Sequence, residues 1–397
     1  MDGKNYKVGL VAAILILALC GGVPWVVMRA QQAAQGSASS KAGGVSGGTA
    51  PTRAEQAAQG SGLSDAARDK VITYFRERFG VPDTVKLSLG SAHPSIAVPS
   101  FNEAVLNLDD GKKQGTQLLL ISKDMRFLIV VNGKIVDLNQ NSAEEMVQRI
   151  HETFKTPANQ KLSMGAFKPS LSSDFEQGTL TVDSGQAKQD IVVLRSRDGK
   201  HLILSEIFNL TVDPKQLALR TIALHDEPTQ GPADAPVTIV EYADLQCPTC
   251  AHMHEFLETQ VVPRYGNKVR VVFKEYPLPM HDWSLIAAVA CQCAYEINPP
   301  SYVLLRSAIF RNQQFINITN LREMLLSNGE QAGVDRVKLA GCLDARSTLP
   351  RVQRDLAEGK RVTVDRTPTL FINGRKMVGL PSDDAYFQAI DAILGGK

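Results

Sequence analysis

The sequence predicts a protein of mixed α/β class, with two small α+β repeat modules in the middle and a larger α/β domain at the C-terminus. Three observations predict this organisation. An uncharged apolar run lies close to the N-terminus, and a stretch of about 75 residues occurs twice in the middle of the chain. After residue 236, a strand, a Cys-x-x-Cys motif and a helix follow one another.

Length and charge narrow the function classes. The chain has 397 residues, of which 44% are hydrophobic, so it can build two or three domains with separate cores. The formal net charge is only +2. We therefore expect no nucleic acid as a partner on electrostatic grounds.

The first element is the apolar run at residues 8–28, VGLVAAILILALCGGVPWVVM, which carries no charge. A helix needs about 20 apolar residues to cross a bilayer. We expect residues 1–29 to form a cytoplasmic stub and a single transmembrane signal anchor. Two alternatives stay open: cleavage as a signal peptide, and lipid attachment at Cys20, because Leu-Ala-Leu-Cys loosely resembles a lipobox.

Residues 30–63 form the next segment. They are rich in alanine, glycine, serine and glutamine and show no apolar periodicity. This composition is typical of a flexible linker, and about 34 residues of this kind span roughly 30–35 Å. Such a linker would let the rest of the protein move away from a membrane surface.

The middle of the chain contains the same pattern twice, in residues 64–142 and 143–225. Each copy begins with an amphipathic helix and ends with alternating apolar strands around a turn. The phrase Lys-Leu-Ser-Leu-Gly at residues 86–90 returns as Lys-Leu-Ser-Met-Gly at residues 161–165, and a Ser-x-Asp turn also occurs in both copies. We predict two small α+β modules of about 75 residues each.

Each copy ends in a short phrase, Ile-Val-Asp-Leu at residues 135–138 and Ile-Phe-Asn-Leu at residues 207–210. The turn and strand around this phrase resemble the N-terminal dimerisation module of DsbC-type periplasmic isomerases, over about 20 residues per copy. The resemblance implies a homodimer formed through residues 64–225. The alternative is a generic small α+β repeat that acts as a spacer or binds something else.

The motif that carries chemistry is Cys247-Pro248-Thr249-Cys250. It stands between an apolar, β-branched strand at residues 237–243 and a segment of helical character. At a helix N-terminus, unpaired backbone N–H groups and the helix dipole stabilise a thiolate. The two intervening residues place the second sulfur one helical turn after the first. Pro248 destabilises the helix little at this early position, because a backbone N–H there would have no partner within the helix. This is the layout that a dithiol redox site needs.

Zinc binding is the competing interpretation of a Cys-x-x-Cys pair. A structural zinc site needs a second pair of ligands. His252 and His254 lie two residues apart on the expected helix and project differently, and Cys291 and Cys293 have the wrong spacing. We expect no metal, and we predict that both histidines are surface residues of the helix.

A second motif near the C-terminus supports redox chemistry. Thr367-Pro368 precedes a strand at residues 369–372, and Asn373-Gly374 then marks a hairpin turn. This pattern fits a strand opened by a cis-proline. In thioredoxin-type folds, such a proline lies against the dithiol, and the residue before it hydrogen-bonds an extended substrate.

Together these motifs resemble the DsbA-like branch of the thioredoxin superfamily. The resemblance covers residues 231–395. It implies a thioredoxin fold in residues 226–397 with a helical insertion at about residues 282–362. The phrases that carry the resemblance, in family order, are GPADAPVTIVEYADLQCPTC, VRVVFKEYPLPMH, AAVACQCAYE, IFRNQQ, GCLD and TPTLFINGR.

The resemblance implies roles for four residues of the dithiol site. Cys247 would be the exposed, attacking cysteine, and Cys250 would be the buried, resolving one. Pro368 would be the cis-proline, and Thr367 would be its neighbour that contacts the substrate.

Glu241 and Lys274 look like the family's buried acid and its charge partner. A buried carboxylate near a dithiol can help to move the proton of Cys250. The alternative is a structural ion pair between the two side chains.

The remaining cysteines follow the same resemblance. Cys293 and Cys342 match positions that form a second disulfide in some relatives, so the resemblance implies that they pair. Cys291 is then left over as a small buried residue. A Cys291–Cys342 pairing is the alternative.

Two positions depart from the family pattern. Oxidising members often carry histidine where this chain has Thr249, so we expect a less stabilised thiolate and a less oxidising disulfide. Arg366 stands where the family usually has glycine, which changes the charge of the expected substrate groove.

The resemblance implies a protein-disulfide oxidoreductase that needs no cofactor and exchanges disulfides with protein thiols. It implies a catalytic domain on the periplasmic side of a bacterial inner membrane, with a redox partner in that membrane. One alternative is a dimeric disulfide isomerase or reductase. Another is a non-catalytic binding or assembly protein that uses the fold as a platform.

Overall fold

The structure is a computed structural model that describes residues 62–395, except 158–159, 184, 186–187 and 380–381. The predicted signal anchor, Cys20 and nearly all of the linker lie outside the described residues. Within the described part of the chain, no helix is long and apolar enough to cross a membrane. The described residues form two compact units, one with residues 62–73 and 85–211, and one with residues 74–84 and 212–395.

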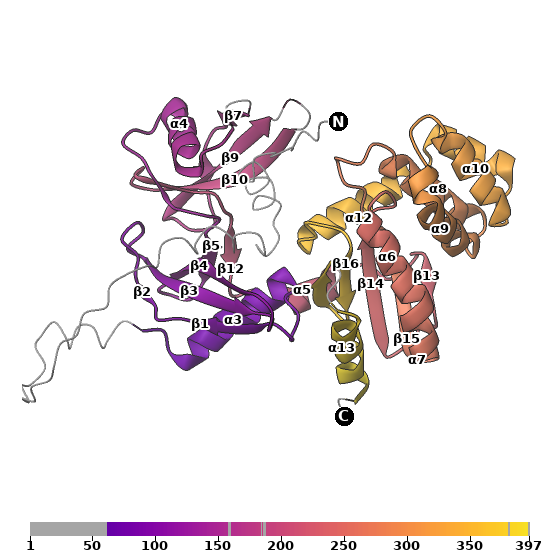
Figure 1. Cartoon of the computed structure of the whole chain (residues 1–397), viewed down its shortest axis with the longest axis horizontal. Helices are drawn as coiled ribbons and strands as arrows, with labels where there is room; N and C mark the ends of the chain where they lie inside the picture. The colour runs from indigo at the N-terminus through magenta and orange to yellow at the C-terminus, as the bar shows by residue number, and fades with distance from the viewer. Residues whose placement is uncertain (1–61, 158–159, 184, 186–187, 380–381, 396–397) are drawn as a thin grey trace, which may run out of the picture. The chain divides into compact units, whose positions relative to one another are not determined.

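The first unit contains two six-stranded antiparallel sheets, each built mainly from one copy of the repeat (Figure 1). In the chain, the first sheet follows α3 (Asp65–Phe79) and has the order β1-β3-β4-β5-β12, with β2 beside β3. Its strands are β1 (Lys86–Leu89), β2 (His93–Pro94), β3 (Phe101–Asp109), β4 (Gln114–Ser122), β5 (Phe127–Val130) and β12 (Ile207–Asn209).

The second sheet has the matching order β6-β11-β10-β9-β7, with β8 beside β9, and packs against α4 (Ala143–Phe154). Ser142 caps α4, because its hydroxyl accepts a hydrogen bond from the N–H of Glu145. The strands of this sheet are β6 (Val136–Asp137), β7 (Lys161–Met164), β8 (Lys168–Pro169), β9 (Phe175–Asp183), β10 (Lys188–Ser196) and β11 (His201–Ile203).

The Ser-x-Asp turn closes the same hairpin in both copies. The Ser122 hydroxyl donates to Asp124 at 2.6 Å and accepts from the N–H of Phe127 at 2.8 Å. In the second copy, Ser196 donates to Asp198 at 2.6 Å. These side chains satisfy the backbone of a tight turn, which is why the sequence repeats them.

The two copies exchange their last strands. β6 follows β5 in the chain, but it pairs with β11 of the second sheet. In return, β12 of the second copy pairs with β5 of the first sheet. The exchanged strands lie in the phrases at residues 135–138 and 207–210. Each copy therefore completes the sheet of the other within one chain.

A shared apolar core joins the two copies. Its members include three pairs from equivalent positions: Phe101 with Phe175, Leu120 with Leu194, and Ile129 with Ile203. The rings of Phe101 and Phe175 meet edge to face, with centroids 5.5 Å apart. A contact between a residue and its own equivalent is what an interface with two-fold symmetry produces. The two copies are therefore related by an approximate two-fold axis.

The second unit contains a five-stranded mixed sheet with the order β13-β15-β14-β16-β17. β14 and β15 are parallel, and the other neighbouring strands are antiparallel. β14 lies in the middle of this sheet and is buried on both faces. The strands are β13 (Thr229–Gln230), β14 (Val237–Ala243), β15 (Val269–Glu275), β16 (Thr369–Ile372) and β17 (Arg375–Val378).

Helices flank this sheet on both faces (Figure 1). α6 (Pro248–Phe256) follows β14 and continues through a π-helical turn (Leu257–Val261) into α7 (Val262–Tyr265). Five helices lie between β15 and β16, where the insertion was expected: α8 (Ser284–Ile297), α9 (Ser301–Asn312), α10 (Leu321–Gln331), α11 (Arg336–Ala345) and α12 (Leu349–Arg361). α13 (Asp383–Gly395) ends the described chain, and short 3₁₀ turns occur at Gly266–Lys268 and Gln313–Phe315.

Alternate side chains of β14 enter two different cores. Ile239 and Ala243 pack with α6, α8, α9 and α13. Val240 and Tyr242 pack on the other face, against Ala218 of α5 (Pro214–Thr221). We predicted that the second repeat would run to residue 225, but α5 packs in the second unit because its apolar face covers this sheet.

Candidate active site

The Cys-x-x-Cys motif lies at the start of α6, immediately after β14. Cys247 is the N-cap residue, and Pro248 occupies the first turn. The side chain of Cys247 is 8% exposed, whereas Cys250 is fully buried. The N–H of Cys250 donates to the carbonyl of Cys247 at 3.0 Å, which keeps both sulfurs in one helical turn. Of the two cysteines, only Cys247 keeps access to a substrate.

The two thiols have opposite proton affinities. A hydrogen bond from the Cys250 thiol lowers the pKa of Cys247 to about 5. Burial of the sulfur opposes this shift, and hydrogen bonds from the backbone N–H groups of Thr249 and Cys250 reinforce it. Burial raises the pKa of Cys250 well above its ordinary value. At neutral pH, the reduced pair is therefore a Cys247 thiolate beside a Cys250 thiol.

A cis peptide bond joins Thr367 to Pro368 next to the dithiol. The Cys247 sulfur lies 3.7 Å from the carbonyl oxygen of Thr367, which is 9% exposed. Pro368 has no N–H group to present at this point. The strand after it, β16, pairs with β14, so the sheet itself places the proline loop against the start of α6.

The Asn373-Gly374 turn also follows the prediction. Both residues have positive φ, 45° and 81°, as a tight hairpin turn between β16 and β17 requires. The Asn373 side chain accepts a hydrogen bond from the N–H of Thr238 at 2.7 Å. The turn is thereby tied to the first residues of β14.

The predicted pair of Glu241 and Lys274 is wrong. The parallel register places Glu241 opposite Phe273 and Tyr242 opposite Lys274, so the two side chains point to opposite faces of the sheet. Lys274 instead lies 2.9 Å from Glu227, 3.0 Å from Glu358 and 3.4 Å from Asp355.

Glu241 forms its ion pair with Arg306 of α9, at 3.0 Å, and both side chains are fully buried. Burial raises the pKa of the Glu241 carboxyl, and the Arg306 guanidinium opposes that rise. The role of Arg306 was not predicted from the sequence. The sequence signal for a buried cation was a single arginine among Tyr302, Leu305 and Ile309, on the buried face of α9.

Asp244 was also missed, although it lies between β14 and the dithiol. Its carboxylate is fully buried and accepts hydrogen bonds from the N–H of Leu278 at 2.6 Å and the hydroxyl of Ser284 at 2.6 Å. It also lies 2.8 Å from Nδ1 of His281. The Asp244 N–H points to the Cys250 sulfur at 3.5 Å. This residue therefore ties the dithiol loop to the segment that enters the insertion.

The two helix histidines differ in environment. His252 is exposed, as predicted, but His254 is 5% exposed, so its predicted surface position is wrong. Nε2 of His254 lies 2.7 Å from the Ser307 hydroxyl. Burial, together with Arg306, lowers the pKa of His254 to about 3, so this histidine is neutral. Among the described residues, no group of three or more His, Cys, Asp or Glu side chains could hold a metal ion.

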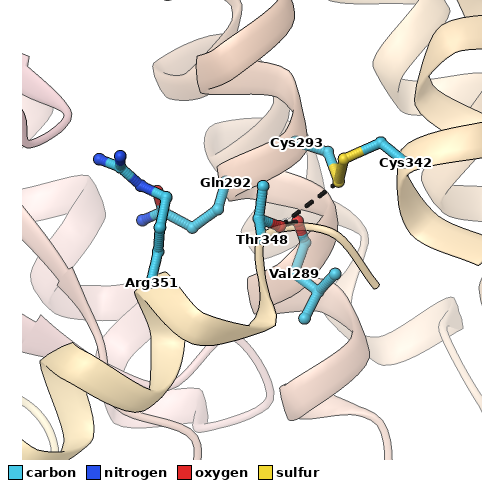
Figure 2. Close-up of a disulfide and its surroundings, with 6 residues drawn as sticks. All are labelled: Val289, Gln292, Cys293, Cys342, Thr348 and Arg351. Atoms are coloured by element: carbon cyan, nitrogen blue, oxygen red, sulfur yellow. Dashed lines mark hydrogen bonds between the residues drawn. A yellow bond between two sulfur atoms is a disulfide. The ribbon is translucent and has the colours of Figure 1, made fainter. Parts of the chain in front are cut away.

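The second sulfur pair lies in the insertion. Cys293 of α8 and Cys342 of α11 form a disulfide, and Figure 2 shows Thr348 beside it, with its hydroxyl 3.4 Å from the Cys293 sulfur. The same hydroxyl donates to the carbonyl of Val289 at 2.8 Å. Cys291 is a free, fully buried thiol, and burial raises its pKa well above the ordinary value.

Comparisons with known proteins agree with this geometry. Residues 224–392 match the family model described as Thioredoxin. The chain is 24% identical over 179 residues to disulfide bond formation protein D of Bacillus subtilis, which covers 44% of this chain and 80% of that protein. It is 28% identical over 148 residues to a putative protein-disulfide oxidoreductase of Rickettsia bellii, which covers 36% of this chain and 56% of that protein.

Other relatives are longer proteins. The chain is 32% identical over 165 residues to the Na(+)/H(+) antiporter NhaA of Herminiimonas arsenicoxydans, which covers 42% of this chain and 24% of the antiporter. The chain thus spans about a quarter of the antiporter relatives that it matches.

Among solved structures, oxidised BdbD from Bacillus subtilis matches 44% of this chain and 96% of its own, with a TM-score of 0.42 and 21% identity. The residues that match the family model, 224–392, include both the dithiol and the cis-proline. In residues 224–392, the chain is therefore similar to the Thioredoxin family model, and it also resembles proteins named for disulfide bond formation and protein-disulfide oxidoreduction.

Proposed function

We propose that this chain exchanges disulfides with protein substrates outside the cytoplasm, through Cys247 and Cys250. One observation carries the proposal: a thiolate-forming sulfur at the N-terminus of α6 faces a buried, protonated thiol within the same turn. The Thr367–Pro368 loop beside Cys247 supplies a carbonyl where an extended substrate would dock. No cofactor is needed for this chemistry.

The exchange proceeds in two thiol–disulfide steps. In the oxidising direction, a substrate thiolate attacks Cys247, the Cys247–Cys250 bond breaks, and Cys250 leaves as a thiolate that takes up a proton. A second substrate thiolate then attacks the substrate sulfur of the mixed disulfide and releases the Cys247 thiolate. Two electrons pass from the substrate dithiol to the enzyme disulfide. Reduction of a substrate runs the same steps backwards.

Glu241 would serve as the proton acceptor for Cys250. Cys250 must lose its proton before it can resolve a mixed disulfide, and burial makes that loss costly. Glu241 extends from β14 on the face that α6 covers, the same face that receives Cys250. Lys274 has no part in this step, because it lies on the other face.

We further propose that residues 8–28 anchor the chain in a bacterial inner membrane, with the oxidoreductase domain on the periplasmic side and a redox partner in the membrane. The uncharged apolar run supports an anchor. The Cys293–Cys342 disulfide supports an oxidising compartment, because such bonds are rare in the cytosol. Protease added to spheroplasts should digest the domain, whereas resistance until lysis would contradict this location.

The proposed activity is tested with the full-length protein and insulin reduction. Cys247→Ser should reduce turnover to background, because no other described sulfur has its environment. Cys250→Ser should accumulate a mixed disulfide on Cys247 that cannot be resolved. The matched control is Cys291→Ser, which removes a buried thiol outside the site and should leave the rate within about twofold. Full activity of Cys247→Ser would reject the proposal.

An isomerase or reductase is the second candidate. The paired modules favour it, since they resemble a dimerisation module, and Thr367 before Pro368 favours it as well. Faster recovery of activity from a scrambled multi-disulfide protein, compared with the Cys247→Ser variant, would select this candidate. A non-catalytic platform would be selected instead if a strain with Cys247→Ala and Cys250→Ala kept full cellular function.

A further inference from the structure

Arg306 is a buried cation that reaches from the insertion to the centre of the oxidoreductase domain. It is fully buried on α9. Its Nη1 lies 3.0 Å from Oε2 of Glu241 on β14 and 3.3 Å from Nδ1 of His254 on α6. Its guanidinium also lies over the rings of Phe273 and Phe310, 4.7 Å and 5.0 Å from their centroids. One side chain thus contacts the central strand, the active-site helix and the insertion.

The contact with α6 is one helical turn from the dithiol. His254 follows Cys250 by four residues, so both lie on the same face of the helix. Nε2 of His254 lies 2.7 Å from the Ser307 hydroxyl, also on α9. Arg306 and Ser307 therefore hold the turn of α6 that follows the resolving cysteine.

Arg306 is the cation for two buried carboxyls. Glu241 is its ion-pair partner, and its charge also acts on Glu275, whose pKa burial raises to about 8. The Tyr302 hydroxyl donates to Glu275 at 2.6 Å. Burial thus favours the neutral form of Glu275, which leaves Glu241 as the ion-pair partner of Arg306.

No other described cation is placed to do this. Lys274, the position that family resemblance assigned to this role, is engaged by three carboxylates on the opposite face of the sheet. His254 is neutral. A buried carboxylate without a cation takes up a proton, because burial disfavours its charge. Glu241 without Arg306 would therefore already hold a proton when Cys250 has to release one.

We propose that Arg306 is a positioning residue for disulfide exchange: it keeps Glu241 ionised on the face of β14 beneath α6, ready to accept the Cys250 proton. This inference rests on the proposed function and deepens it. In the step concerned, the proton moves from Cys250 to the Glu241 carboxylate. The Cys250 sulfur then attacks Cys247, the mixed disulfide breaks, and the substrate leaves as a thiolate while the enzyme becomes oxidised.

The test is the pH dependence of mixed-disulfide resolution in the full-length protein. Reduced protein is mixed with oxidised glutathione, quenched with acid and analysed by mass spectrometry for the glutathionylated intermediate. In Arg306→Met, resolution at pH 7 should slow by on the order of ten- to a hundredfold, the size of a lost proton acceptor. The rate should recover at higher pH, because Glu241 now ionises only there. Arg306→Lys keeps a cation and should restore most of the rate.

Two comparisons separate this effect from a general loss of packing. Arg322→Met removes an exposed arginine of the same insertion, whose ion pair with Asp344 lies in solvent, and should leave the pH profile unchanged. The double variant Glu241→Gln with Arg306→Met buries no net charge, so it should fold even if Arg306→Met does not. It should resolve the intermediate as fast as Glu241→Gln alone, since the arginine acts through the glutamate.

An unchanged pH profile in Arg306→Met, or a double variant slower than Glu241→Gln, would overturn the role of Arg306 while leaving the proposed function intact. If Cys250→Ser, which cannot resolve the intermediate, forms no glutathionylated species on Cys247, the proposed function itself fails.

Discussion

At the residue scale, the site works because two identical side chains have different surroundings. Cys247 receives hydrogen bonds at a helix N-terminus, and Cys250 is buried where a negative charge is costly. A substrate therefore meets the sulfur that is already ionised. The low pKa of Cys247 also makes it a good leaving group, which favours the reduced form of the pair.

The first prediction concerns the titration of Cys247. In the reduced protein, thiolate absorbance at 240 nm should rise with a midpoint near pH 5, against about 8.5 for an ordinary thiol. Cys250→Ala removes the main hydrogen-bond donor, so the midpoint should rise by about one pH unit or more. A wild-type midpoint near 8.5 would contradict the assigned environment.

The same shift couples stability to pH. The pKa of Cys247 is lower in the folded than in the unfolded state. Its contribution to the free energy of unfolding is therefore complete above the unfolded pKa and is lost as the pH falls through about 5. The oxidised protein lacks this titration. Between pH 8 and pH 5, the reduced form should lose stability relative to the oxidised form, as urea unfolding of both forms would show.

The second prediction assigns Lys274 a structural role. Lys274→Met leaves Glu227, Asp355 and Glu358 without their cation, and all four side chains are almost completely buried. The free energy of unfolding should fall by about 3–5 kcal/mol at pH 7. The loss should shrink towards pH 5, because burial raises the pKa of Asp355 to about 7 and this carboxyl becomes neutral as the pH falls. Urea unfolding measures both effects.

The control for this prediction is Lys360→Met, an exposed lysine of α12. It should change the free energy of unfolding by no more than about 0.5 kcal/mol. A Lys274→Met protein as stable as this control would show that the three carboxylates do not depend on Lys274.

The residues of the site differ in how far the sequence predicts them. The short motifs around Cys247, Cys250 and Pro368 are local, because a few adjacent residues determine both the backbone and the chemistry. The partner of Glu241 is not local. It depends on the register of β14 against β15 and on which insertion helix packs over α6, and neither follows from spacing along the chain. Family resemblance therefore suggested Lys274, on the wrong face.

At the element scale, the insertion is held together by a covalent bond and by buried polar groups. The Cys293–Cys342 disulfide joins α8 to α11 across 49 residues of sequence. Thr348, just before α12, hydrogen-bonds the carbonyl of Val289 on α8. In Figure 2, Arg351 of α12 reaches Gln292 of α8, where its Nε donates at 3.0 Å. Three helices of the insertion thus share one contact region.

The third prediction is that this disulfide stabilises the insertion without taking part in exchange. The double variant Cys293→Ala with Cys342→Ala should lower the free energy of unfolding by about 2–4 kcal/mol. The insulin reduction rate should change little, because Cys247 and Cys250 are untouched. Peptide mapping without reductant should yield the Cys293–Cys342 pair. A peptide that links Cys291 to Cys342 would contradict the structure.

Helical elements were predictable as a class, because apolar periodicity between residues 282 and 362 is a local property of the chain. The position of α5 was not. Its apolar side chains can cover either neighbouring sheet, so the sequence alone placed it with the repeat that precedes it. In the structure, Ala218 and Ile222 pack against Val240 and Phe371 instead. Tertiary packing decided the boundary.

At the scale of the whole molecule, the structure shows how the two copies of the repeat pair with each other, which the repeated sequence alone does not reveal. β6 and β12 have equivalent sequences. The same apolar residues would therefore be buried whether each strand stayed in its own sheet or paired with the other one. The repeat was predictable from matching phrases, but the exchange was not. The exchange places inside one chain the type of contact that a homodimer makes between two chains.

The last prediction is therefore that the protein is a monomer with one dithiol for each pair of modules. Phe101 already packs against Phe175, and β12 and β6 already pair with the edges of β5 and β11. Among the described strands, these edges are therefore not open to pairing with a second chain. Light scattering of the full-length protein in detergent, corrected for bound detergent, should give a protein mass near 43.2 kDa.

Phe101→Ala should lower the free energy of unfolding of both copies together, by about 3–5 kcal/mol in a single unfolding transition, because neither sheet is complete without the other. A protein mass of twice the monomer value that persists at low micromolar concentration would contradict the prediction of a monomer. It would mean that the strands are exchanged between chains, as in an isomerase-type dimer.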